Sequence, residues 1–474
     1  LSCDWIAYRL GAMGFLPVRE GVGGGSGRLN GVNDMIVALQ WVQANVRSFG
    51  GDPGHVTVFG ESAGSIAICM LSVSPRASGL FLRAVMESGT CLGPSSHDPV
   101  EDKADAQPVA VLRGMNVSDV MALRYGVGVD GWVLPKSAAE LLEESGGRNV
   151  NVDSFLMGAN SFDGLLPWYP EAYLPKTWAA YNASVLTTLS RRGFSPAATE
   201  AVLARYSPAR YLTEPATGEP YYRAALTQLN GDLGFVCPTI ALHRQLGQLG
   251  KTAFLYYFDY GPSCSDVAGH AWGDASPYAT AGGMASHTAE IDYVFGTVIP
   301  AGLQARPVPM ADPTASECNP MTEERFSRGS SARLTTAMQQ FWTSFAKTGV
   351  PTADSSLVPP HDGVQWPAGD GAASSGPVMV LGETIGIVPG HKDGDCAVLL
   401  PPSTGGGPTE AIGAAAAVPA DTGEFCYVCV LACIGALVAV GAGCKRKLVV
   451  KGDGADSIYA AAVSDPTTGG ETAN

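Results

Sequence analysis

Residues 60–64 read Gly-Glu-Ser-Ala-Gly, a Gly-x-Ser-x-Gly pattern centred on Ser62. In such a pattern the serine stands on a sharp turn between a strand and a helix, where a base takes its proton and the oxygen attacks a carbonyl carbon. The pattern alone is weak evidence, because 59 of the 474 residues are glycine and a chance match would be unremarkable. Its position strengthens it, since residues 55–59 have strand character and a helical stretch follows. We predict that Ser62 is a nucleophile and that the Ala63 N–H stabilises the oxyanion.

Seven histidines compete for the role of the base, and the base needs a carboxylate to hold its tautomer. On a turn of this kind the chain order is serine, then acid, then histidine. His55 and His97 come too early for any suitable acid, and His361 and His391 lie in a loop-rich region. Order alone does not decide between His270 and His287.

The elements around Ser62 alternate between strand and helix patterns. Apolar residues at helical spacing predict helices over 34–49, 65–71 and 332–346. Short β-branched and aromatic runs predict strands over 6–8, 56–59, 81–87, 154–157 and 253–260. Strands separated by helices predict an α/β protein whose mostly parallel sheet is covered on both faces. After Pro351 the sequence becomes loop-rich.

The sequence resembles the type-B carboxylesterase/cholinesterase family of α/β-hydrolases over about residues 1–385. Besides residues 60–64, the matching segments are 8–11 (Tyr-Arg-Leu-Gly), 14–16 (Gly-Phe-Leu), 41–45 (Trp-Val-Gln-Ala-Asn), 49–53 (Phe-Gly-Gly-Asp-Pro), 86–89 (Met-Glu-Ser-Gly), 130–131 (Asp-Gly), 235–238 (Phe-Val-Cys-Pro), 341–342 (Phe-Trp) and 366–367 (Trp-Pro). The resemblance implies a serine esterase that acts on small-molecule carboxylic esters and needs no metal or cofactor.

The resemblance also assigns roles to particular residues. His287, in the segment 287–296, matches the catalytic histidine. Asp163 aligns with an acid that is usually glutamate in the family, and either carboxylate can orient a histidine. Ser88 is expected to hydrogen-bond near the acid, and Glu61 and Glu290 are expected to shape the site.

One part of the family pattern is not in this sequence. The family's further oxyanion donors come from a glycine-rich loop that precedes the strand in which this chain begins. We therefore expect the esterase domain, residues 1–400, to lack its first strands at the N-terminus. Since losing one oxyanion donor costs about 3 to 4 kcal/mol of transition-state stabilisation, the chain by itself is expected to be a poor or inactive enzyme.

The C-terminal region has a different composition. Residues 425–444 carry no charge and are long enough to cross a bilayer as a helix, and Lys445-Arg446-Lys447 follows directly. The positive-inside rule then predicts a type I membrane protein, with the esterase body extracellular or luminal. Residues 401–424 would form a stalk rich in proline, glycine and alanine, and residues 445–474 a cytoplasmic tail.

Charge and cysteine content bear on partners and compartment. The net charge of −15 argues against nucleic-acid binding. Sequons at Asn116 and Asn182 fit an extracytoplasmic glycoprotein, and some of the seven cysteines before residue 401 are expected to form disulfides, with pairing that cannot be read from sequence. Two functions remain: a membrane-tethered esterase using Ser62, or a cholinesterase-like adhesion protein that has lost its chemistry. The oligomeric state and the particular ester are not determined.

Overall fold

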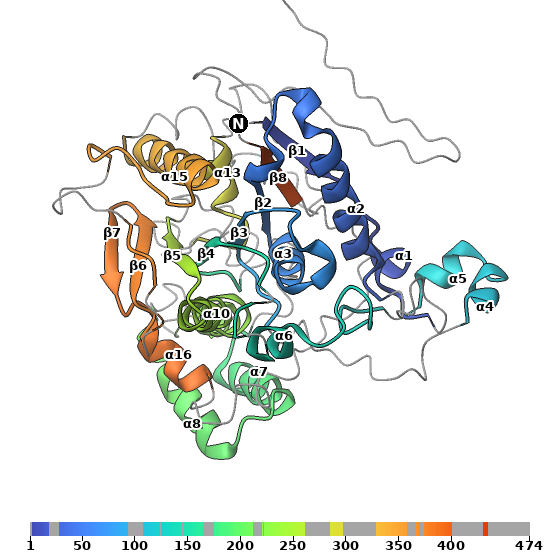
Figure 1. Ribbon diagram of the computed structural model, residues 1–474. Coiled ribbons are helices and arrows are strands. Elements are labelled where there is room, and N and C mark those ends of the chain that lie inside the picture. The colour runs from blue at the N-terminus through green and yellow to red at the C-terminus, as the bar shows by residue number, and fades with distance from the viewer. Residues whose placement is uncertain are drawn as a thin grey trace, which may run out of the picture.

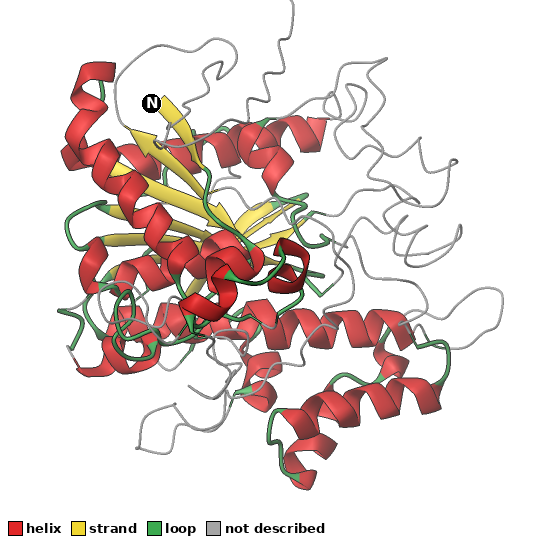
Figure 2. Cartoon of the chain, turned by 90° about the vertical axis from the view of Figure 1, so that its right-hand side faces the viewer, coloured by secondary structure: helices red, strands yellow, loops and turns green. Residues whose placement is uncertain are grey.

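The computed structural model contains one eight-stranded sheet with helices on both faces (Figures 1 and 2). It describes residues 2–18, 28–92, 108–123, 125–144, 146–148, 150–164, 175–211, 220, 222–260, 285–296, 329–357, 366–369, 371, 374–400 and 430–434. The statements below concern these residues.

The central sheet has the strand order β1-β8-β2-β3-β4-β5-β6-β7. Its strands are β1 (Ser2–Ile6), β2 (Val56–Glu61), β3 (Arg83–Glu87), β4 (Ser154–Asn160), β5 (Thr252–Asp259), β6 (Pro377–Gly382), β7 (Ile385–Pro389) and β8 (Val430–Ile434). Strands β2 to β6 are parallel, whereas β7 is antiparallel to β6 and β8 is antiparallel to both of its neighbours. The predicted α/β fold with a mostly parallel sheet is confirmed.

Alternation along the strands divides the core between the two faces of the sheet. On β4, Phe155 and Met157 face a core that includes α2 (Asn30–Asn45), α3 (Ala63–Val73) and α10 (Cys237–Gln248). Leu156 faces the other way, toward α13 (Ile291–Phe295) and α15 (Gly329–Thr348). Figure 1 shows these two groups of helices on opposite sides of the strands.

The structure describes further α-helices besides these. They are α1 (Gly11–Phe15), α4 (Val109–Arg113), α5 (Val117–Met121), α6 (Ala138–Glu144), α7 (Trp178–Arg191), α8 (Pro196–Arg205), α9 (Tyr222–Gly231) and α16 (Asp393–Leu399). The helix predicted over 332–346 and the strands predicted before it are all present, with ends displaced by a few residues. The region after Pro351 is less loop-rich than predicted, because β6, β7 and α16 lie within it.

The uncharged run 425–444 was predicted to be a transmembrane helix. The structure describes only Val430–Ile434 of it, and these residues form β8 between β1 and β2, so the helix prediction is wrong for them. A short apolar run suits a buried strand as well as a helix, and here its backbone hydrogen-bonds to two strands at once. None of the helices in the described ranges is both long and apolar enough to span a bilayer. The rest of the run, residues 401–424 and residues 445–474 lie outside the described residues.

Candidate active site

Ser62 stands on the turn between β2 and α3. Its backbone has φ 56° and ψ −117°, a strained conformation for a residue with a side chain. Two contacts hold the turn: the Ser62 N–H donates to the Glu87 carbonyl over 2.8 Å, and Gly89 lies against the Ser62 carbonyl. A Cβ added at Gly89 would lie 2.6 Å from that oxygen, so glycine is required here.

Ala63 is the first residue of α3 and is exposed. The first N–H groups of a helix have no carbonyl partner within the helix and carry the positive end of its dipole. The Ala63 N–H therefore stands beside the Ser62 hydroxyl in a position suited to an anionic oxygen.

His287 and Asp163 are 124 residues apart in sequence and meet in the core. Nδ1 of His287 lies 2.7 Å from Asp163 Oδ1, and the two side chains are 1% and 0% exposed. Since a carboxylate only accepts, Nδ1 carries the hydrogen of this contact. The second carboxylate oxygen of Asp163 accepts the Asn160 N–H over 2.8 Å, which fixes the acid at the end of β4.

The imidazole contacts the turn at Ser62 through Glu61. Nε2 of His287 is 3.1 Å from Glu61 Oε1, on the residue that precedes Ser62. Within the described part of the chain, Nε2 and the Ser62 hydroxyl do not hydrogen-bond to each other. Hydrogen bonds of this kind are often long without substrate and tighten when substrate binds.

Two fully buried carboxyl groups lie behind the imidazole. Glu290 accepts from the Asn160 side chain, and Glu87 accepts from Trp342 Nε1 over 3.0 Å. Burial, reinforced by the negative charge of Glu290, raises the pKa of Glu87 to about 8. Burial and the charge of Asp163 raise the pKa of Glu290 to about 7. Burial thus disfavours the ionised form of both groups.

Tyr256 and Ser88 complete this buried layer. Across β2 to β5, the residues in register are Glu61, Glu87, Gly158 and Tyr256. The Tyr256 ring fills the space beside Gly158, where an added Cβ would lie 2.3 Å from the ring. Among the described residues, the hydroxyls of Tyr256 and Ser88 have no hydrogen-bond partner, so the hydrogen bond that Ser88 is expected to form near the acid is not present there.

Sequence reasoning gave no role to three residues that the structure brings to the site. Glu87 and Phe235 stood inside matched segments, and Asn160 ends β4. The Phe235 ring packs against the His287 imidazole with centroids 4.8 Å apart. A charged residue among the apolar residues of 83–87 was the available signal for Glu87, whereas nothing in the sequence indicated the Phe235 contact.

The alternative histidines do not join this site within the described residues. His55 pairs with Asp52 on the surface, at 2.6 Å. His270, His97 and His361 lie outside the described residues. Disulfides join Cys69 to Cys91 and Cys237 to Cys396, so the general expectation of disulfides is met.

A mostly parallel sheet with a serine on the strand-to-helix turn and a buried histidine–aspartate pair is consistent with an α/β-hydrolase. The model of the carboxylesterase family matches residues 5–124 and 110–386, so the chain belongs to that family. It is 30% identical over 376 residues to carboxylesterase 5A of Canis lupus familiaris, covering 73% of this chain and 57% of the relative. It is 30% identical over 404 residues to the liver carboxylesterase of Sus scrofa, covering 77% and 62%. The chain thus spans about three fifths of the length of these relatives.

Proposed function

We propose that this protein hydrolyses small-molecule carboxylic esters through an acyl-enzyme on Ser62. His287 Nε2 takes the hydroxyl proton as Oγ attacks the ester carbonyl, and the tetrahedral oxyanion is stabilised by the Ala63 N–H. The intermediate collapses, and the protonated imidazole gives its proton to the departing alcohol. Water, deprotonated by the same imidazole, then releases the carboxylic acid and restores Ser62.

The observation that carries this proposal is the buried 2.7 Å contact between His287 Nδ1 and Asp163 Oδ1. It holds the tautomer that leaves Nε2 as a base, and it stabilises the imidazolium formed in each half-reaction. Burial raises the pKa of Glu87 and of Glu290, which limits the negative charge packed around Asp163.

The test uses the purified protein, a p-nitrophenyl acyl ester and a fluorophosphonate label. Ser62→Ala is expected to abolish labelling and Ser62-dependent hydrolysis. Ser190→Ala, which changes an exposed serine on α7, serves as the matched control and should behave like the wild type. Equal labelling of wild type and Ser62→Ala, or equal and measurable rates of ester hydrolysis by the two proteins, would overturn the proposal.

We also propose an extracytoplasmic compartment for the body of the protein, supported by its two disulfides, because disulfides persist in oxidising environments. Membrane attachment through residues 425–444 stays a prediction that competes with the strand at Val430–Ile434. Alkaline extraction of cell membranes distinguishes the two states: a spanning segment keeps the protein in the pellet, and a sheet-bound segment releases it. Deletion of residues 425–444 is the control, since it should release the protein in either case.

A further inference from the structure

Phe235 covers the imidazole that the proposed mechanism uses as its base. The planes of the two rings are tilted by 35°, with centroids 4.8 Å apart. Phe235 is half-buried, whereas His287 is 1% exposed. The partly exposed aromatic ring therefore lies against one side of the buried imidazole.

Phe235 reaches this position because it lies on a π-helical turn, Asp232–Val236, inserted between α9 and α10. A π-turn has poorer hydrogen-bond geometry than an α-helix and occurs mostly as single turns, often at functional sites. Such a turn persists when its surroundings hold it. In this structure, side-chain contacts fix Asp232 at the start of the turn and Cys237 just after its end.

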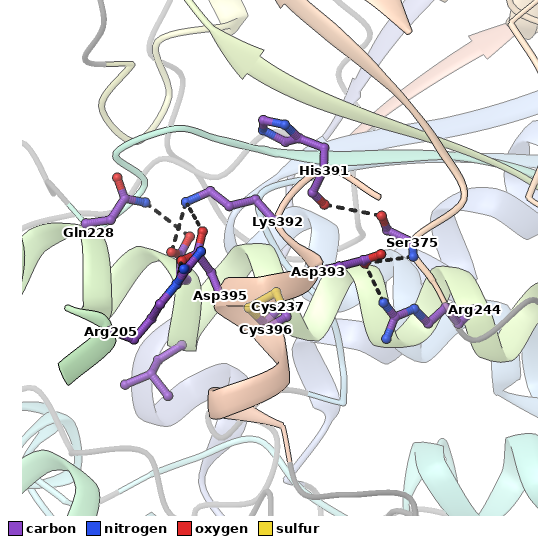
Figure 3. Close-up of a disulfide and its surroundings, with 12 residues drawn as sticks. Arg205, Gln228, Cys237, Arg244, Ser375, His391, Lys392, Asp393, Asp395 and Cys396 are labelled. Carbon is purple, nitrogen blue, oxygen red and sulfur yellow. Dashed lines mark hydrogen bonds and ion pairs between the residues drawn. A yellow bond between two sulfur atoms is a disulfide. The ribbon is translucent and has the colours of Figure 1, made fainter. Parts of the chain in front are cut away.

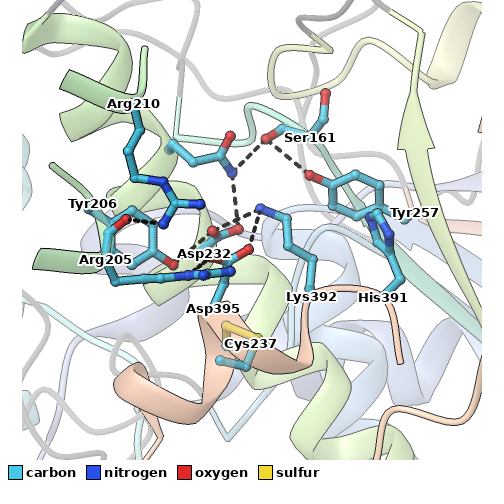
Figure 4. A network of polar contacts seen from close by, with 12 residues as sticks. Ser161, Arg205, Tyr206, Arg210, Asp232, Cys237, Tyr257, His391, Lys392 and Asp395 are labelled. Atoms are coloured by element: carbon cyan, nitrogen blue, oxygen red, sulfur yellow. Dashed lines mark hydrogen bonds and ion pairs between the residues drawn. A yellow bond between two sulfur atoms is a disulfide. The ribbon is translucent and has the colours of Figure 1, made fainter. Parts of the chain in front are cut away.

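The first residue of the turn, Asp232, is held by a buried polar network (Figure 4). Its side chain is fully buried, and Oδ2 lies 3.0 Å from Lys392 Nζ and accepts from the Tyr206 hydroxyl over 2.9 Å. Oδ1 accepts from Gln228 Nε2 over 3.1 Å. Moving the carboxylate away from one of these partners would leave a buried charge incompletely paired, which is costly. The network therefore fixes the backbone at Asp232.

The residue that follows the turn, Cys237, is held covalently. It forms a disulfide with Cys396 on α16 (Figure 3). Lys392 directly precedes the same helix, and its Nζ also lies 3.4 Å from Asp395. The ion-pair partner of Asp232 and the disulfide partner of Cys237 therefore both come from residues 392–396. One short segment therefore holds both ends of the π-turn.

We propose that Phe235 is a positioning residue for His287, and that Lys392 and Cys396 hold the π-turn that presents it. This inference rests on the proposed function of His287. The titratable groups that face the imidazole are Glu61 from the end of β2, Asp163 from beyond β4 and Glu290 from its own segment. Phe235 adds an apolar cover to these polar partners.

The direct test compares Phe235→Ala with Phe235→Tyr, which keeps the ring. Phe235→Ala is expected to lower kcat about tenfold through misplacement of the base, with a smaller change in KM. Because water then reaches the imidazole and favours its protonated form, the acidic limb of the kcat/KM profile should move to higher pH. Phe235→Tyr should keep the wild-type profile.

A second readout does not depend on turnover. The signals of the His287 ring, assigned with His287→Gln, are followed by NMR as the pH is changed. The midpoint of this titration is expected to rise by about half a pH unit or more in Phe235→Ala and to stay unchanged in Phe235→Tyr. An unchanged His287 titration in folded Phe235→Ala overturns the inference even if the enzyme is active. A changed titration in a protein without esterase activity supports the ring contact while the proposed function fails.

The contribution of Lys392 to the position of the π-turn is tested by substitutions that leave Phe235 in place. Asp232→Asn combined with Lys392→Met removes the ion pair without leaving an unpaired charge between them. It should shift the His287 titration in the direction of Phe235→Ala. Arg244→Met is the matched control, because Arg244 pairs with Asp393 of the same helix at 2.6 Å and lies outside the Asp232 network. Equal effects of the double variant and the control would remove Lys392 from the proposal.

Discussion

At the scale of single residues, two neighbouring acids of the site have opposite tasks. Asp163 is fully buried, touches the imidazole and accepts a backbone N–H. Glu87 is equally buried, has one donor in Trp342, and faces the negative charge of Glu290, so its pKa is raised. The two carboxyl groups therefore differ in their contact partners and not in their depth of burial.

Replacing Asp163 by asparagine should remove the control of the tautomer while keeping the shape of the side chain. We expect kcat for a p-nitrophenyl ester to fall about ten-thousand-fold, and Asp163→Glu to retain much more activity. Asp52→Asn is the control, since Asp52 forms an exposed Asp–His contact of similar length with His55. Comparable losses in Asp163→Asn and Asp52→Asn would contradict the assigned role.

Glu87 should make stability depend on pH. Its pKa is about 8 in the folded protein and 4.5 in the unfolded chain, so between these values the folded state binds more protons. Stability is then greatest below the unfolded pKa and is lost as pH rises through the folded value, by at most about 1.4 kcal/mol per pH unit. Glu87→Gln, measured by urea unfolding from pH 4.5 to 8.5, should flatten this slope. Glu144→Gln, which changes an exposed acid, should leave it as it is.

At the scale of elements, the site depends on close approach between the turn after β3 and the start of α3. Ser65 Oγ donates to the Gly89 carbonyl over 2.6 Å, and the Cys69–Cys91 disulfide joins the same two segments. These contacts leave no room for a side chain at residue 89, whose Cβ would meet the Ser62 carbonyl.

Gly89→Ala should therefore push the Ser62 turn away from its position. A displacement of about 1 Å at the reacting group can cost a hundredfold in rate, and we expect kcat to fall on that order in a folded protein. Gly386→Ala is the matched control, because a Cβ there meets nothing within 4 Å. Full activity of Gly89→Ala, measured with circular dichroism to verify folding, would show that the turn tolerates the shift.

At the scale of the whole molecule, the two disulfides close loops of very different length. Cys237 and Cys396 are 159 residues apart, and Cys69 and Cys91 are 22 apart. The chain-entropy model gives about 5 kcal/mol for the longer loop and about 3 kcal/mol for the shorter one.

Removing each pair as a double alanine variant should accordingly lower the free energy of unfolding more for Cys237 and Cys396 than for Cys69 and Cys91. Urea unfolding without reductant measures both, and wild type under reducing conditions should approach the combined loss. A larger loss from the shorter loop would indicate that strain or packing outweighs loop entropy in this fold.

The sequence by itself determined many of the elements and the sharp turn at Ser62. Residues 55–64 carry a strand, a glycine-flanked serine and a helix start in immediate succession, and local spacing specifies all three. The resemblance to a family gave roles to Asp163 and His287, and the roles themselves stay predictions. Family membership followed from the same matched segments.

Only the tertiary structure decided which distant groups meet. The contact of Phe235 with His287, the burial of Glu87 against Trp342 and the pairing of the cysteines join residues up to 255 positions apart. It also made a strand of Val430–Ile434, where an apolar run suits a helix or a strand equally. The physical reason is the same in each case: burial and backbone pairing depend on partners that the local sequence does not contain.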